Sequence, residues 1–125
     1  MLALPILHTL SRDKLSVFLF HKVPKVPDSL APNDVDLASF ESMLDRIGKN
    51  FRVLPVGDAV ECLRNGSLPR RTACITFDDG YPEWLANVVP ALERRGAHAT
   101  FFVTTGQFHG LPMWNERILY AIDRA

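Results

Sequence analysis

Four short apolar runs, rich in β-branched and aromatic residues, divide the chain into segments of different periodicity. They predict strands over Leu15–Phe20, Phe51–Leu54, Cys74–Phe77 and Ala99–Val103. The third run shows no alternation of polar and apolar residues, and the fourth is apolar throughout. Such runs are typical of strands that are buried on both faces, as in a parallel sheet.

Helical periodicity fills the stretches between these runs. Apolar residues recur at helical spacing from Leu37 to about Lys49, and Asp36 precedes them as an N-cap. A second amphipathic helix begins near Val56 and is stopped by Asn65-Gly66. The two long helices therefore separate the first three strands.

Three shorter helices are predicted toward the ends of the chain. The apolar segment Met1 to Leu10 lacks a basic region and a cleavage site, which favours a short helix over a signal peptide. Pro90 suits the first turn of a helix that runs to Arg95 and is capped by Gly96. A final helix is expected from Asn115 to Arg124, with three apolar residues on one face.

The alternation of strands and helices predicts an α/β fold, with about four parallel strands and right-handed crossover helices. The strand ends Phe20-His21, Leu54, Phe77-Asp78 and Val103-Thr104 should then share one edge of the sheet. Active sites of α/β sheets and barrels lie at that carboxyl edge.

Two adjacent carboxylates close the third strand in the string Thr76-Phe77-Asp78-Asp79-Gly80. Two acids side by side repel each other, so keeping both ionised is costly unless a cation or a shared proton is present. A divalent metal removes that cost. The alternative is an ordinary polar turn, because Asp and Gly are common turn residues.

Composition narrows the class of protein. The chain of 125 residues has 47% hydrophobic residues, and its fourteen basic and fourteen acidic residues cancel. This describes a globular chain with no membrane span and no electrostatic footprint for nucleic acid, and a neutral polymer suits it better as a partner. Cys62 and Cys74 lack the spacing of a zinc knuckle or a disulfide scaffold, so we expect buried thiols.

The acid-bearing string resembles the first motif of the NodB-like polysaccharide deacetylases, also called carbohydrate esterase family four. Further segments are similar to other parts of the family pattern, in the same order: Leu19-Phe20-His21-Lys22-Val23, Gly96-Ala97-His98-Ala99-Thr100-Phe101-Phe102-Val103 and Met113-Trp114-Asn115. Together these matches extend over most of the chain.

The resemblance implies a fold and a domain division. The expected fold is the N-terminal half of a distorted (β/α) barrel of the NodB or glycoside hydrolase-deacetylase type. An α/β barrel usually needs about 250 residues, so a chain of this length holds roughly half of one. We therefore expect an N-terminal helical segment over residues 1–14 and a partial deacetylase domain over residues 15–125, without the C-terminal part.

The resemblance also implies roles for three residues. Asp79 corresponds to a metal ligand, Asp78 to the catalytic general base, and His21 lines the site as a substrate-binding or second-shell residue. For His21 the alternative is a histidine that anchors its loop through backbone hydrogen bonds.

The expected cofactor is a divalent metal, most simply zinc, but its histidine ligands are absent from this chain. The family's second motif, His-(Ser/Thr)-x-x-His, does not occur, and a catalytic zinc normally has three protein ligands. His98 and His109 are predicted to be surface residues.

These observations predict a metal-dependent polysaccharide deacetylase, a hydrolase of carbon-nitrogen bonds that removes N-acetyl groups from an amino-sugar polymer. As this 125-residue chain it should be inactive. A non-catalytic carbohydrate-binding or inert fragment is the main alternative. A receiver-type signalling domain is a weaker one, because its acid pair should follow the first strand. The sequence does not fix the compartment, which is cytoplasmic or associated with the cell envelope, nor the oligomeric state.

Overall fold

The computed structural model describes residues 14–29, 31–106 and 113–123. Its strands are β1 (Ser16–Phe20), β2 (Arg52–Val53), β3 (Thr72–Asp79) and β4 (Thr100–Val103). Its helices are α2 (Leu37–Asn50), α3 (Val56–Arg64), the 3-10 helix η1 (Pro82–Trp84), α4 (Val88–Glu93) and α5 (Trp114–Asp123). The predicted helix over Met1 to Leu10, and the loop predicted near His109, lie outside the described residues.

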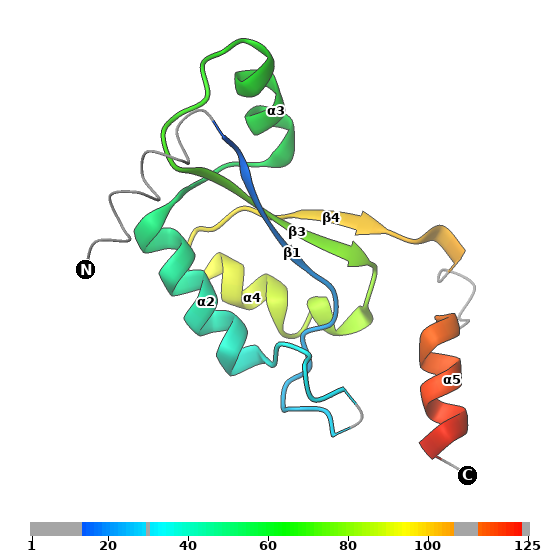
Figure 1. Ribbon diagram of the computed structural model, residues 1–125. Helices are drawn as coiled ribbons and strands as arrows, with labels where there is room; N and C mark the ends of the chain where they lie inside the picture. The colour runs from blue at the N-terminus through cyan, green and yellow to red at the C-terminus, as the bar shows by residue number, and fades with distance from the viewer. Residues whose placement is uncertain (1–13, 30, 107–112, 124–125) are drawn as a thin grey trace.

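The long strand β3 organises the sheet, because the other three strands all pair with it (Figure 1). Every pairing is parallel. β1 pairs along Ala73–Phe77, and β4 pairs along Thr76–Asp79. This arrangement confirms the predicted α/β class and the parallel sheet.

The prediction that Leu54 lies at the carboxyl edge is wrong. β2 pairs only with Thr72 and Ala73 at the start of β3, and the Leu54 N–H donates to the Ala73 carbonyl over 2.9 Å. The next residue is Pro55, which has no N–H and cannot extend the ladder. The second strand therefore ends near the amino end of β3, and the other three predicted strand ends remain at the carboxyl edge.

The two long helices form as their sequences predict. Asp36 is the N-cap of α2, and its side chain accepts a hydrogen bond from the Ser39 N–H over 2.8 Å. Asn65 is the C-cap of α3, and Gly66 follows in a left-handed conformation with φ of 66°.

The predicted start of α4 at Pro90 needs correction. The helix begins at Val88, so Pro90 is its third residue, and η1 precedes it. The first four N–H groups of a helix have no partner within it, so a proline at the third position removes no hydrogen bond. Gly96 does follow this helix with a positive φ of 56°, as predicted.

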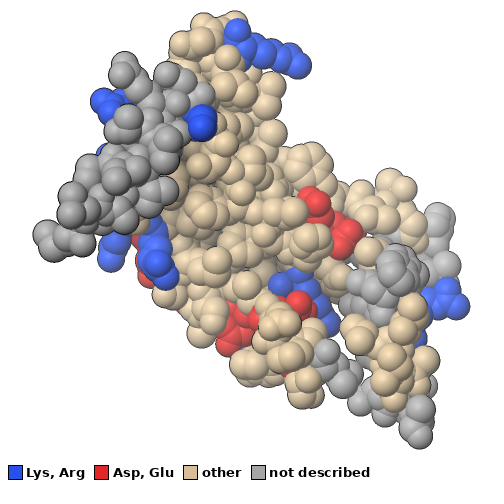
Figure 2. Space-filling model, in the orientation of Figure 1, with Lys and Arg blue, Asp and Glu red and all other residues tan. Residues whose placement is uncertain are grey.

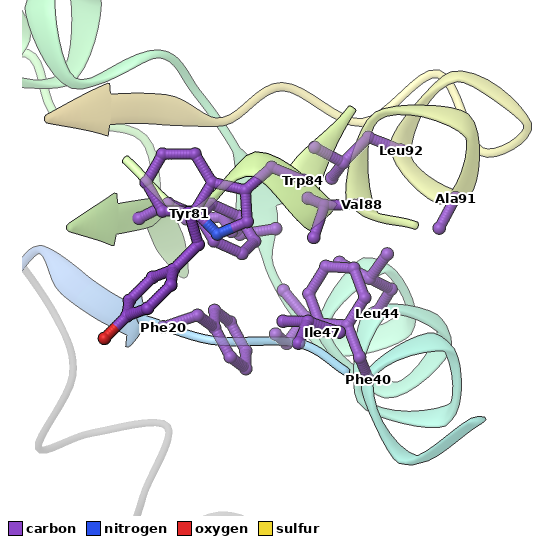
Figure 3. Close-up of a cluster of buried hydrophobic side chains, with 12 residues drawn as sticks. Phe20, Phe40, Leu44, Ile47, Tyr81, Trp84, Val88, Ala91 and Leu92 are labelled. Atoms are coloured by element: carbon purple, nitrogen blue, oxygen red, sulfur yellow. The ribbon is translucent and has the colours of Figure 1, made fainter. Parts of the chain in front are cut away.

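One face of the sheet carries the core, which α2 and α4 cover (Figures 1 and 3). Its buried members are Phe20, Val23, Phe40, Leu44, Ile47, Ile75, Phe77, Tyr81, Trp84, Val88, Ala91 and Leu92. At the surface, the Arg95 guanidinium in the turn after α4 lies 2.7 Å from the Asp45 carboxylate of α2. That hydrogen bond lowers the pKa of Asp45. The buried side chains on this face pack α2 and α4 against the strands.

The opposite face of the sheet is much less covered. Side chains alternate along a strand, so Val17 and Leu19 lie on the face away from Phe18 and Phe20. Val17 is 55% exposed, Leu19 is 51% exposed and Phe102 of β4 is 51% exposed. Figure 2 shows that the middle of one side of the molecule is largely uncharged. Parallel sheets are normally covered on both faces. Among the described residues this face is instead an exposed apolar surface, and such surfaces commonly mark interaction sites.

We expect the 125-residue chain to self-associate through this exposed face and to be only marginally stable as a monomer. Burying a leucine side chain contributes about 1.5–3 kcal/mol. Leu19→Ser should therefore weaken association at least about tenfold, as measured by sedimentation velocity over a concentration series.

Leu85 provides the matched control, because it is 79% exposed but lies in the turn after η1 rather than in the sheet. Leu85→Ser should leave association unchanged. A monomer at all concentrations with a sharp, reversible thermal transition would contradict the expectation.

Candidate active site

The two carboxylates of the acid-bearing string are the last two residues of β3 rather than residues after it. Both are half-buried. Asp78 pairs in register with Phe102 and Asp79 with Val103, so β4 flanks the acids on one side. Figure 2 shows a small acidic group at the surface near the carboxyl end of β3. The strand therefore carries its acids up to the rim of the sheet.

The backbone changes hand at this rim. Asp79 has φ of 87° and Gly80 has φ of 93°. The carbonyl of Asp79 nevertheless stays in the ladder, because it accepts a hydrogen bond from the Thr104 N–H over 3.2 Å. The regular alternation of side chains thus ends at Asp78, and the direction of the Asp79 side chain is set by the turn.

A positive φ is costly for most residues with a side chain. The penalty is about 1–2 kcal/mol, although Asp and Asn accept this region more readily than others. Glycine would avoid the penalty, yet the chain has an aspartate there. Strained conformations of this kind gather at functional sites, which supports a functional reason for the carboxylate.

His21 lies at the same edge as the acids, as predicted. Phe20 pairs with Phe77, so His21 is the first residue beyond β1 just as Asp78 is the next residue of β3. The His21 side chain is exposed, but its backbone is held. Its carbonyl accepts a hydrogen bond from Nε1 of Trp84 over 2.7 Å.

Trp84 and Asn87 are contacts of this site that sequence reasoning missed. The Asn87 side-chain amide donates to the Val23 carbonyl over 2.9 Å, and both residues are buried. A buried indole N–H and a buried amide need hydrogen-bond partners. Trp84 and Asn87 lie three residues apart, shortly after the acid motif, and this pattern could have marked them as candidates. Their partners could not be identified from the sequence, because they lie more than sixty residues away.

The described residues do not make a complete metal site by themselves. Among residues 14–29, 31–106 and 113–123, no three His, Cys, Asp or Glu side chains gather closely enough to hold a metal ion. Glu83 of η1 does not complete such a group, although its buried Oε1 has no hydrogen-bond partner in the described part of the chain. Asp78 and Asp79 therefore form no three-ligand group with another described residue.

The other described candidates, His98, Cys62 and Cys74, belong to no group that could hold a metal ion. His98 is exposed, as predicted, and His109 lies outside the described residues. Cys74 is buried in β3, and burial raises the pKa of its thiol, which favours the unreactive protonated form. Cys62 is half-buried rather than buried. In the described part of the chain, no helix is long and apolar enough to cross a membrane.

The segment that carries the acids matches a known protein family. Residues 65–119, which contain β3, both acids and β4, match the family model of polysaccharide deacetylase. No match was found among curated proteins.

Solved structures of deacetylases share the fold. IcaB from Ammonifex degensii is 28% identical, with a TM-score of 0.65 over 74% of this chain and 39% of its own. The Streptococcus pyogenes deacetylase PplD, solved in complex with acetate, is 22% identical, with a TM-score of 0.65 over 74% of this chain and 43% of its own. The BpsB deacetylase domain from Bordetella bronchiseptica is 23% identical, with a TM-score of 0.54 over 80% of this chain and 40% of its own.

The parallel sheet with acids at its carboxyl edge is thus part of a NodB-type deacetylase barrel. The chain is thus similar to polysaccharide deacetylases over residues 65–119 in sequence and over about three quarters of its length in fold. It spans about two fifths of the length of the solved structures that it matches.

The backbone at Asp79 leads to a prediction about stability. Asp79→Gly should leave the free energy of unfolding unchanged or raise it by up to about 1 kcal/mol, because relief of strain outweighs the greater freedom of glycine in the unfolded chain. Asp79→Val should lower it by about 1–2 kcal/mol. Urea denaturation at concentrations where the chain is monomeric measures both.

Arg71 offers a matched control, because it also has a positive φ, 56°, at the opposite end of β3. Arg71→Gly should have the same small effect on stability as Asp79→Gly. If Asp79→Val were as stable as the unaltered chain, the positive φ would not be a constraint in solution.

Proposed function

We propose that this chain is part of a metal-dependent enzyme that hydrolyses N-acetyl groups on an amino-sugar polymer. The observation that carries the proposal is the pair Asp78 and Asp79 at the carboxyl end of β3, inside the segment that matches the deacetylase family. The match to IcaB extends the likeness over most of the described fold.

The two acids take different roles in this proposal. Asp79 would hold the metal, most simply zinc, together with ligands from outside the described residues. A bound zinc polarises the acetyl carbonyl and lowers the pKa of a water to about 7. Asp78 is the general base that accepts the proton of the attacking water. A general acid for the leaving amine is not among the residues assigned here.

His21 is proposed to contact the substrate or a metal ligand from the adjacent strand. It is exposed at the same edge as the acids, and its backbone is fixed by the Trp84 hydrogen bond. An exposed side chain on a fixed backbone is free to contact a ligand without losing burial.

The family match and the balance of charges support a substrate class. A chain with fourteen basic and fourteen acidic residues has no net charge to attract a strongly anionic polymer. An N-acetylated polysaccharide or oligosaccharide fits that balance.

A non-catalytic carbohydrate-binding or inert fragment remains the second candidate. The observation in its favour is that the described residues hold no group of three potential metal ligands. A receiver-type domain is not supported, because the acids follow the third strand and the family match is to deacetylases.

The different roles of the two acids can be tested in an extended protein, meaning one that contains these 125 residues together with the histidine motif of the family. Asp79→Ala removes a ligand, so zinc content and acetate release should fall together. Asp78→Asn keeps the shape but cannot accept a proton, so the rate should fall about 10²–10⁴-fold while zinc stays bound. Zinc is measured by elemental analysis, and acetate release is measured on N-acetylglucosamine oligomers.

Asp58→Asn is the matched control, because Asp58 is an exposed aspartate in the first turn of α3. It should change neither zinc content nor rate. The 125-residue chain alone should bind no stoichiometric zinc and release no acetate. Acetate release by that short chain, or zinc loss from Asp78→Asn with retention in Asp79→Ala, would refute these roles.

A further inference from the structure

We propose that Trp84 and Asn87 are positioning residues of the active site. They tie the backbone that follows β1 to the turn that follows the acids, and so fix where His21 stands relative to Asp78. This inference rests on the function proposed above, and it adds two residues that the acid and histidine motifs do not include.

The two hydrogen bonds join segments that are far apart in sequence. Nε1 of Trp84 lies 2.7 Å from the His21 carbonyl oxygen, and Nδ2 of Asn87 lies 2.9 Å from the Val23 carbonyl oxygen. Trp84 is only 6% exposed and Asn87 only 8% exposed. Loss of the Asn87 amide would leave the buried Val23 carbonyl unpaired, and loss of the Trp84 N–H would release the part-buried His21 carbonyl.

A third hydrogen bond holds the same stretch from another direction. The N–H of Leu37, the first residue of α2, donates to the Pro24 carbonyl over 2.8 Å. Within four residues after β1, three carbonyl oxygens are therefore bound by groups from η1, the turn before α4, and α2. The path of residues 21–24 is fixed by its partners rather than by regular secondary structure.

The indole ring of Trp84 packs against aromatic rings from residues close to the acids. The Trp84 ring lies 5.6 Å from Phe77, the residue before Asp78, and 5.2 Å from Phe101 of β4. Tyr81 packs on it at 6.3 Å, and Figure 3 shows these two rings side by side. These contacts fix the position of the indole N–H relative to β3, the strand that carries the acids.

The exposure of His21 explains why such a clamp matters. Its side chain is exposed, so the fixed backbone sets its place at the edge. Displacement of an active-site group by about 1 Å can cost up to about 100-fold in rate. Fixing the His21 carbonyl keeps that displacement small.

Trp84→Phe in the extended protein tests the clamp, because phenylalanine keeps an aromatic ring and removes the N–H. We expect kcat/KM for acetate release to fall about 10- to 100-fold with zinc content unchanged. Asn87→Ala should act in the same direction. Asn50→Ala is its control, since the Asn50 side-chain amide also donates to a backbone carbonyl, that of Arg46, but at an exposed position within α2. Its kcat/KM should stay within about twofold.

Phe40→Leu controls for lost stability. Phe40 is fully buried and packs on Phe77, but it makes neither clamp hydrogen bond. At a matched fall in Tm, Phe40→Leu should keep kcat/KM within about twofold of the unaltered protein. An equal loss of activity in Phe40→Leu and Trp84→Phe would show that Trp84 serves stability alone and would overturn the inference.

A double-mutant cycle between Trp84→Phe and His21→Ala gives the decisive readout. If Trp84 acts through His21, the double variant loses no more activity than His21→Ala alone. Additive losses would overturn the positioning role. The carbonyl carbon resonance of His21, labelled with ¹³C, should also shift in Trp84→Phe but not in Phe40→Leu.

The same experiments separate failure of the clamp from failure of the proposed function. An unshifted His21 resonance in Trp84→Phe would refute the clamp while leaving deacetylation intact. No acetate release by the unaltered extended protein would refute the proposed function, and the resonance shift would then stand as evidence for the clamp alone.

Discussion

The packing of Phe77 is the constraint on which the rest of the structure depends. Its ring stacks on Phe20 of β1 at 5.4 Å and on Phe101 of β4 at 5.0 Å. The rings of Phe40 and Trp84 meet it edge to face. Aromatic contacts of this kind contribute about 0.5–1.5 kcal/mol each beyond their burial. Since Asp78 is the next residue, the stacking of Phe77 between Phe20 and Phe101, which holds three strands together, also places the first acid.

Most of the elements could be predicted from the sequence because their signals are local. The spacing of apolar residues predicted α2 and α3, and Asp36 and Gly66 marked an N-cap and a C-terminal turn that the structure confirms. The four strands were visible as apolar runs. The common edge of His21 and Asp78 followed from the expectation that strands joined by helices run parallel.

The rest could not be predicted because it depends on partners that are distant in the chain. The position of Leu54 against Ala73 is a matter of register, which no local pattern sets for a strand of two residues. The hydrogen bonds of Trp84 and Asn87 cross more than sixty residues. The positive φ of Asp79 is a local feature, but an Asp-Asp-Gly string is compatible with several turns.

The conformation of Asp79 also bears on which acid can occupy this position. Aspartate and asparagine are enriched at positive φ, because a short polar side chain can bond to the nearby backbone, whereas glutamate lacks that advantage. A glutamate at this position would keep the charge but lose tolerance of the turn, and its carboxylate would reach about one carbon–carbon bond farther. The positive φ at the end of β3 therefore favours aspartate over glutamate, whether or not a ligand is bound. Exchange of Asp79 for glutamate is not a conservative change in this fold.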